Sequence, residues 1–63
     1  MKKKIRVRET EETVSILASD TDGTYRIVWH RIAGPEEEFL VTPAEDETVE
    51  EAVEQDLINR LGP

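Results

Sequence analysis

The single histidine, His30, is the side chain best suited to acid–base chemistry, because imidazole exchanges protons near neutral pH. It would serve catalysis only if a nucleophilic side chain lay within hydrogen-bonding reach. The strand neighbours of His30 offer no nearby serine, and the sequence has no Gly-x-Ser-x-Gly turn or glycine-rich phosphate loop. The sequence therefore predicts that His30 is a half-buried sheet residue and that the protein is not an enzyme.

The segment Asp20-Thr21-Asp22-Gly23 has the side chains of a calcium ligand set but not the spacing. A calcium loop places oxygen ligands at positions one, three and five, glycine at six and glutamate at twelve. Here the glycine is fourth and no glutamate is twelfth, so we expect a plain turn in which the aspartates accept backbone N–H groups. The absence of cysteine also excludes disulfides and cysteine-based zinc sites. We expect no metal and no cofactor.

The basic side chains are concentrated at the start of the chain and the acidic side chains in the rest of it. Residues 1–8 contain five basic side chains and no acid, namely Lys2, Lys3, Lys4, Arg6 and Arg8. The remaining residues contain three basic and fifteen acidic side chains, and the chain as a whole carries −7. The first strand could contact phosphates, so a nucleic-acid-binding module is one hypothesis. The net acidity and the lack of interleaved aromatics favour instead cross-strand pairing of these bases with acidic neighbours.

These side chains must be positioned by four short strands. Alternation of apolar and polar residues predicts strands at residues 4–9, 13–19, 24–33 and 38–42. The short link 10–12 makes the first two strands a hairpin, and Gly34-Pro35 breaks the third. The predicted core face consists of Ile5, Val7, Val14, Ile16, Ile27, Trp29, Phe39 and Val41.

A helix follows the strands. Its apolar stripe recurs at steps of three and four, with Ile58 at its margin: Val49, Ala52, Val53, Leu57 and Leu61. Thr48 and Glu51 have the spacing of a capping box, whereas a start near Thr42 would place acids on the stripe. Gly62-Pro63 ends the helix. The sequence thus predicts an α+β fold, a four-stranded antiparallel β-meander with one C-terminal α-helix on one face, in a single domain of residues 1–63.

One helix leaves the other face of the sheet uncovered, and that face is predicted to carry Leu17, Val28, His30, Ile32 and Leu40. Acids gather around the helix start, namely Glu45, Asp46, Glu47, Glu50 and Glu51. A domain this small buries only about 60% of its unfolded surface, so association would stabilise it. We therefore expect a small acidic protein-binding regulator or inhibitor that forms a homodimer and has a protein partner, for which a basic protein is one candidate. Without an apolar run of about 18 residues, we expect a soluble, cytoplasmic protein.

Residues 13–61 resemble the small HicB-type antitoxin domain. The resemblance lies in the turn and strand from Asp20 to Trp29, and in the helix start Glu47-Thr48-Val49-Glu50-Glu51-Ala52. It implies a sheet-and-helix scaffold that masks a basic protein partner. The chain departs from the family after Trp29, where His30-Arg31-Ile32-Ala33-Gly34 replaces a proline-rich segment, and in its added basic strand. A designed domain with no evolved partner is a further alternative, because regular alternation and strong caps suit one.

Overall fold

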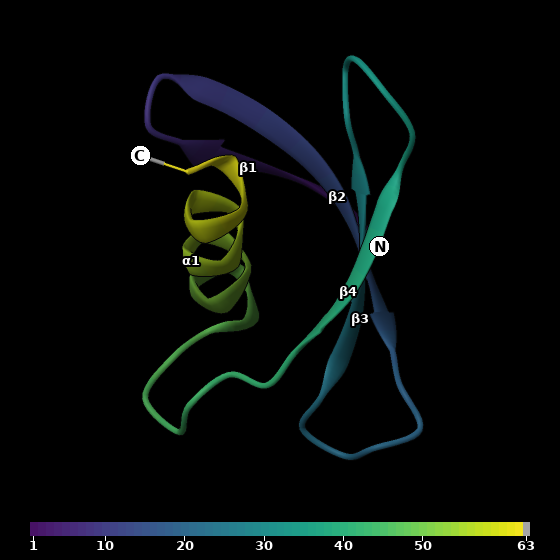
Figure 1. Ribbon diagram of the computed structural model, residues 1–63. Coiled ribbons are helices and arrows are strands. Elements are labelled where there is room, and N and C mark those ends of the chain that lie inside the picture. Colours follow the sequence, from purple (N-terminus) through teal and green to yellow (C-terminus); the bar gives the residue numbers. More distant parts are fainter. Residues whose placement is uncertain (63) are drawn as a thin grey trace.

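The computed structural model describes residues 1–62, and Pro63 lies outside the described residues. The chain forms β1 (Lys2–Val7), β2 (Thr10–Ala18), β3 (Tyr25–His30), β4 (Glu37–Val41) and α1 (Val49–Leu61). The strands are antiparallel and adjacent in sequence order, and the helix packs on one side of the sheet (Figure 1). The predicted α+β class and the β-β-β-β-α order are confirmed.

The first hairpin is tighter than predicted. Val7 pairs with Thr10, so the loop is Arg8-Glu9 and not residues 10–12. Two-residue hairpin loops require positive φ, and Arg8 adopts a φ of 57°. The Thr10 hydroxyl donates a 3.0 Å hydrogen bond to the Val7 carbonyl and closes the turn. As a result, β2 begins three residues earlier than the alternation suggested.

The third strand ends at His30, three residues before the predicted end at residue 33. Residues 31–36 leave the ladder and reverse the chain, with Gly34 at a φ of 99°. Glycine takes this left-handed conformation without a side-chain clash, and the following Pro35 has no N–H for a ladder bond. Ile32 therefore lies in a loop rather than in the sheet.

The turn between β2 and β3 is confirmed, but its hydrogen bonds come from an unexpected side chain. Ser19 accepts the Thr21 N–H at 3.1 Å, and its hydroxyl donates to the Thr24 carbonyl at 2.7 Å. Gly23 supplies the positive φ of 80°. The predicted role of the two aspartates in holding backbone N–H groups is thus wrong, because Ser19 occupies that position. Both carboxylates remain at the surface.

The helix begins where the sequence predicts. Thr48 Oγ1 accepts the Glu51 N–H at 3.1 Å, and Glu51 Oε1 accepts the Thr48 N–H at 2.9 Å, which completes the capping box. At the other end, the Gly62 N–H donates a 3.1 Å hydrogen bond to the Ile58 carbonyl. Both ends of α1 therefore have partners for backbone groups that a helix leaves unpaired.

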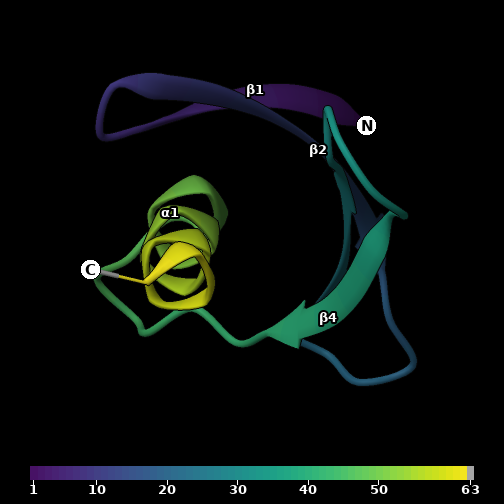
Figure 2. The ribbon, with the colours of Figure 1, turned by 45° about the horizontal axis from the view of Figure 1, so that its top comes forward.

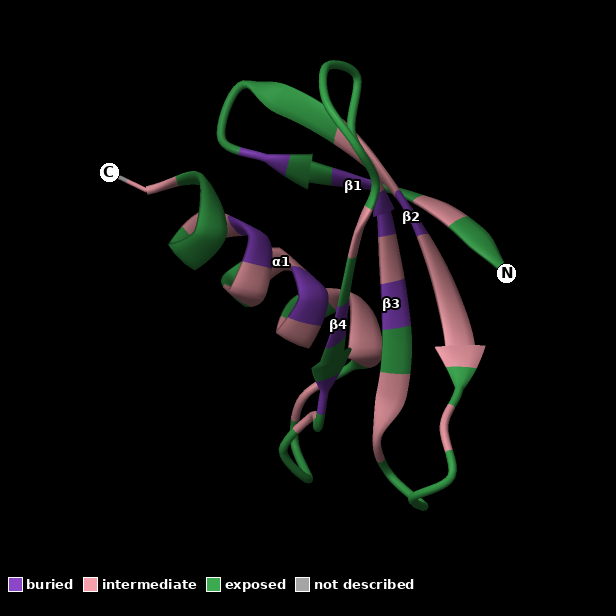
Figure 3. Ribbon diagram, turned by 45° about the vertical axis from the view of Figure 1, so that its right-hand side comes forward, coloured by how far each residue is buried: buried purple, intermediate pink, exposed green. Residues whose placement is uncertain are grey.

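The sheet is strongly curved, and α1 lies in its hollow between the two edge strands, β1 and β4 (Figure 2). Buried positions line the inner face of the sheet and one stripe of the helix (Figure 3). The core consists of Ile5, Val7, Val14, Ile27, Trp29, Phe39, Val41, Val53 and Leu57. Ile16, Val49 and Ala52 are only partly buried, and Leu61 is 42% exposed, so four positions of the predicted core face and helix stripe lie at the margin.

Within residues 1–62, no helix combines the length and the apolar character that a membrane crossing demands.

Candidate functional site

The face of the sheet that points away from α1, here called the outer face, is the candidate site. The strand register arranges its side chains in rows. One row runs Lys2, Ser15, Val28 and Glu38; the next runs Lys4, Thr13 and His30; a third, at the far end, runs Leu17, Arg26 and Leu40. Most side chains on this face are therefore polar, and the apolar ones are Val28, Leu17 and Leu40.

The predicted apolar surface is smaller than the sequence suggested. Leu17 and Val28 are half-buried on the outer face, and Leu40 is 61% exposed beside Arg26. Ile32 is 94% exposed but lies in the loop between β3 and β4, so its assignment to this face is wrong. The extra length assumed for the third strand caused that error.

The basic strand does not form one continuous cationic surface. Lys3 points to the helix side of the sheet, where its Nζ lies 3.1 Å from Glu50 Oε2. Lys4 pairs loosely with Glu11, at 3.9 Å, on the outer face. Arg8 lies in the hairpin turn, whereas Lys2, Lys4 and Arg6 share the outer face of β1. The pairing of strand cations with acidic neighbours, which the sequence favoured, is thus present for two of the five basic side chains.

Some acidic side chains near the helix start stabilise the fold through ion pairs or hydrogen bonds, and others have neither. Glu50 is paired with Lys3, and its pKa is lowered below 4.5 by its backbone hydrogen bond at the helix start and then by the Lys3 ammonium. Glu51 caps α1, and Glu47 Oε1 accepts the Ala44 N–H at 3.1 Å. Among residues 1–62, no basic side chain forms an ion pair with Glu45 or Asp46.

Two acidic loops lie at the same end of the molecule. The β2–β3 turn carries Asp20 and Asp22, and the β4–α1 loop carries Glu45 and Asp46; both loops lie at the lower end in Figures 1 and 3. A hydrogen bond of 2.9 Å between the hydroxyls of Thr24 and Thr42 links their strands. We call these four exposed carboxylates the acidic end. In the described part of the chain, none of the four has a basic partner in an ion pair.

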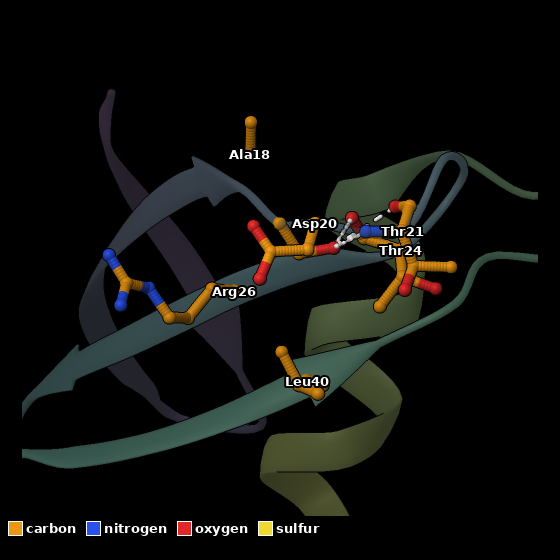
Figure 4. A pocket seen from close by; sticks show the side chains of 7 residues that line it. Ala18, Asp20, Thr21, Thr24, Arg26 and Leu40 are labelled. Carbon is orange, nitrogen blue, oxygen red and sulfur yellow. Dashed lines mark hydrogen bonds between the residues drawn. The ribbon is translucent and has the colours of Figure 1, made fainter.

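A hollow of about 350 Å³ lies where the acidic end meets the outer face. It is lined by Ala18, Ser19, Asp20, Thr21, Thr24, Arg26 and Leu40. Figure 4 shows that carboxylate, guanidinium, hydroxyl and apolar groups border the same space. The volume is at the lower limit of small-molecule sites, which suits a single inserted side chain. This hollow was not predicted from the sequence, because it depends on the register that places Arg26 beside Leu40.

His30 has two polar partners that the sequence analysis missed. Ser15 Oγ lies 2.7 Å from His30 Nε2, and Glu36 Oε2 bonds to His30 Nδ1. The expectation that no serine lies near His30 is therefore wrong. Ser15 and His30 are diagonal neighbours on β2 and β3, since Thr13 is the direct partner of His30. Glu36 reaches His30 because continuing the β3–β4 register by one residue would place the two side by side.

Among the described residues, no group of three or more histidine, cysteine, aspartate or glutamate side chains is arranged to hold a metal ion. Comparison of the chain with protein-family models, with curated proteins and with solved structures finds no match.

Proposed function

We propose that this chain is a protein-binding module that docks the acidic end and the adjoining outer face onto a basic surface of another protein. The observation that carries the proposal is the set of four carboxylates, Asp20, Asp22, Glu45 and Asp46, which the described residues leave without cations. Glu50 and Glu51, by contrast, already contribute to an ion pair and to the helix cap. The chain therefore has uncompensated charge at one end, where it attracts an oppositely charged partner.

The hollow beside Asp20 suggests how such a partner is held. A lysine or arginine side chain from the partner would lay its aliphatic stem against Leu40 and bring its charged head to the Asp20 carboxylate. Long basic side chains often bury their stems while the charge stays near water. The half-buried Leu17 and Val28 extend the contact across the outer face. This arrangement supports an inhibitor or regulator of the antitoxin-like kind, which masks a basic protein.

A basic partner suits the charges better than a second copy of the chain. Each copy carries −7, and opposing two acidic ends would bring like charges together. We therefore place the homodimer, as well as the nucleic-acid alternative, second to a heteromeric complex. Sedimentation of the pure protein at micromolar concentration distinguishes a dimer from a monomer that awaits a partner.

The test is a capture experiment followed by a quantitative comparison. A protein recovered on the immobilised chain is purified, and its affinity is measured for the wild type and for the double variant Asp20→Asn with Asp46→Asn. The matched control is Glu9→Gln with Glu11→Gln, which changes the net charge equally at the hairpin end. We expect at least a tenfold loss for the first variant only, and an association rate that falls with salt. Equal affinities for both double variants would contradict the proposal.

A further inference from the structure

The Ser15–His30–Glu36 cluster has the connectivity of a nucleophile, a base and an orienting carboxylate. Glu36 is an acceptor when ionised, so neutral His30 carries its proton on Nδ1 and donates it to that carboxylate. His30 Nε2 is then free to accept, and Ser15 Oγ–H donates to it across 2.7 Å. This distance lies within the range that general-base activation of a hydroxyl needs. The same order of atoms recurs in hydrolases on unrelated folds.

A cation, Lys2, and a surface hollow lie beside Ser15. The register places Lys2 directly opposite Ser15 on the outer face, and among residues 1–62 no acid forms an ion pair with Lys2. Directly opposite side chains have Cβ atoms about 5 Å apart, so the ammonium can reach negative charge that develops beside Ser15 Oγ. A hollow of about 140 Å³ lined by Lys2, Lys3, Lys4 and Thr13 adjoins this position.

We propose that Ser15 is a reactive nucleophile that is acylated by small activated esters, with His30 as general base and Glu36 as the positioning residue. Ser15 Oγ bonds to the acyl carbon while its proton passes to His30 Nε2, and the bond to the leaving oxygen breaks. The leaving group takes up that proton, or it departs as the anion and His30 passes the proton to solvent, so that His30 is neutral again before the next step. Water then attacks the acyl-Ser15, giving a proton to His30, and the carboxylic acid leaves as Ser15 regains its hydrogen.

This site lies apart from the four carboxylates of the acidic end, although it shares the outer face with Val28, the direct partner of Ser15, and its reactivity is measured on the chain alone. His30 is 27% and Glu36 62% exposed, so water reaches the cluster freely. Buried triads owe much of their rate to a water-excluded oxyanion site, and here Lys2 is the nearest cation in the register. The chemistry is therefore restricted to acyl groups that already carry a good leaving group, and amides are not substrates.

The experiment incubates the folded protein with 4-nitrophenyl acetate. Nitrophenolate release is followed by absorbance, and the acetylated residue is located by peptide mass spectrometry. Hydroxylamine separates an ester on Ser15 from amides on the nearby lysines, because it cleaves only the ester. We expect a hydroxylamine-sensitive acetyl group on Ser15 and its complete loss in Ser15→Ala.

Single substitutions measure the separate contributions of His30, Lys2 and Glu36 to the reactivity of Ser15. His30→Gln should lower the rate of Ser15 acetylation by about 100-fold, the lower end of what a general base contributes. Lys2→Gln should lower it less, whereas Arg6→Gln, with the same change of charge on the same strand, should not. Glu36→Gln should lower the rate of Ser15 acetylation, because a neutral amide stabilises the imidazolium less than a carboxylate does, whereas Glu36→Asp, which keeps the carboxylate, should restore part of the rate. Glu36 is exposed, so these variants test the cluster without threatening the fold.

Three outcomes would overturn the proposal. The first is labelling of lysines without an ester on Ser15. The second is equal acetylation of Ser15 in the wild type and in His30→Gln, with both folded by circular dichroism. The third is nitrophenolate release by Ser15→Ala at the wild-type rate, which would show that groups other than Ser15 carry the reaction.

Discussion

The Arg60 guanidinium lies 4.0 Å from the centroid of the Phe39 ring and joins the last turn of α1 to the edge strand β4. Its Nη1 also lies 2.8 Å from Glu37 Oε1, and its Nε bonds to Asp56 Oδ1 one helical turn earlier. One side chain thus covers the margin of the core and ties helix to strand. We expect Arg60→Ala to lower the free energy of unfolding by about 1 kcal/mol, through lost packing and cation–π contact.

Urea denaturation measures this loss. The matched control is Arg26→Ala, which removes an exposed arginine from the outer face, where it has no core ring beneath it. If the two variants unfold at the same urea concentration, Arg60 contributes only ordinary surface charge.

The capping box provides a second stability prediction. Thr48→Ala should cost about 0.5–2 kcal/mol, because the Glu51 N–H loses its acceptor. Thr42→Ala should cost less, since Thr42 only exchanges an exposed hydroxyl hydrogen bond with Thr24. Denaturant titration of both variants should give this order, and the reverse order would show that the β4–α1 loop contributes more than the cap.

The buried indole provides a third. Trp29 is 3% exposed, and its Nε1–H donates a 2.9 Å hydrogen bond to Glu12 Oε1. Trp29→Ala should cost about 3–5 kcal/mol, a large part of the stability of a small domain. Trp29→Phe keeps most of the volume but leaves Glu12 without its donor, so it should cost less. Native fluorescence should have a blue-shifted maximum, and a maximum typical of indole in water would contradict the burial.

Acid sensitivity provides the fourth. The folded-state pKa of Glu50 lies below the ordinary value of 4.5, so its stabilising contribution is complete above that pH. The contribution disappears as the pH falls through the lower, folded-state pKa. Glu50→Gln removes the titration, so the stability difference from the wild type should shrink below pH 4.5. Unfolding curves at pH 7, 4.5 and 3 measure this convergence, and a constant difference would mean that Glu50 does not act through its charge.

Prediction from the sequence was correct for elements whose position depends on a single local pattern. The Thr48–Glu51 spacing located the helix start, and alternation around Ile27 and Trp29 assigned the buried face of β3. It failed where the chain reverses. Arg8 has a positive φ that residue type does not signal, and residues 31–33 continue an apolar–polar pattern although Gly34 and Pro35 already require a loop.

The Ser15–His30 contact was within reach of the sequence, unlike the Glu36 contact. Val14 was predicted to lie on the core face. Because neighbouring residues of a strand point to opposite faces, Ser15 must lie on the outer face, the same face as His30. Their diagonal contact then needed only the register of β2 and β3, which is set by the length of the Ser19–Thr24 turn. The contact between Glu36 and His30 could not be predicted from the sequence. The third strand was predicted to continue to residue 33, and a strand of that length does not allow the chain to return toward His30 at Glu36.

The curved sheet that closes around α1 also governs how the chain reaches its native state. The helix contacts β1 and β4, which stand at opposite ends of the strand order, so neither edge is complete until the last segment docks. The three hairpins can form from neighbouring residues, but the Lys3–Glu50 pairing spans almost the whole chain. Closing a loop of that length costs chain entropy before the core residues are buried. We therefore expect the sheet to become stable only when the helix docks, in a single cooperative transition. Trp29 fluorescence and helical circular dichroism should accordingly change together, with no sheet that persists after the helix has melted.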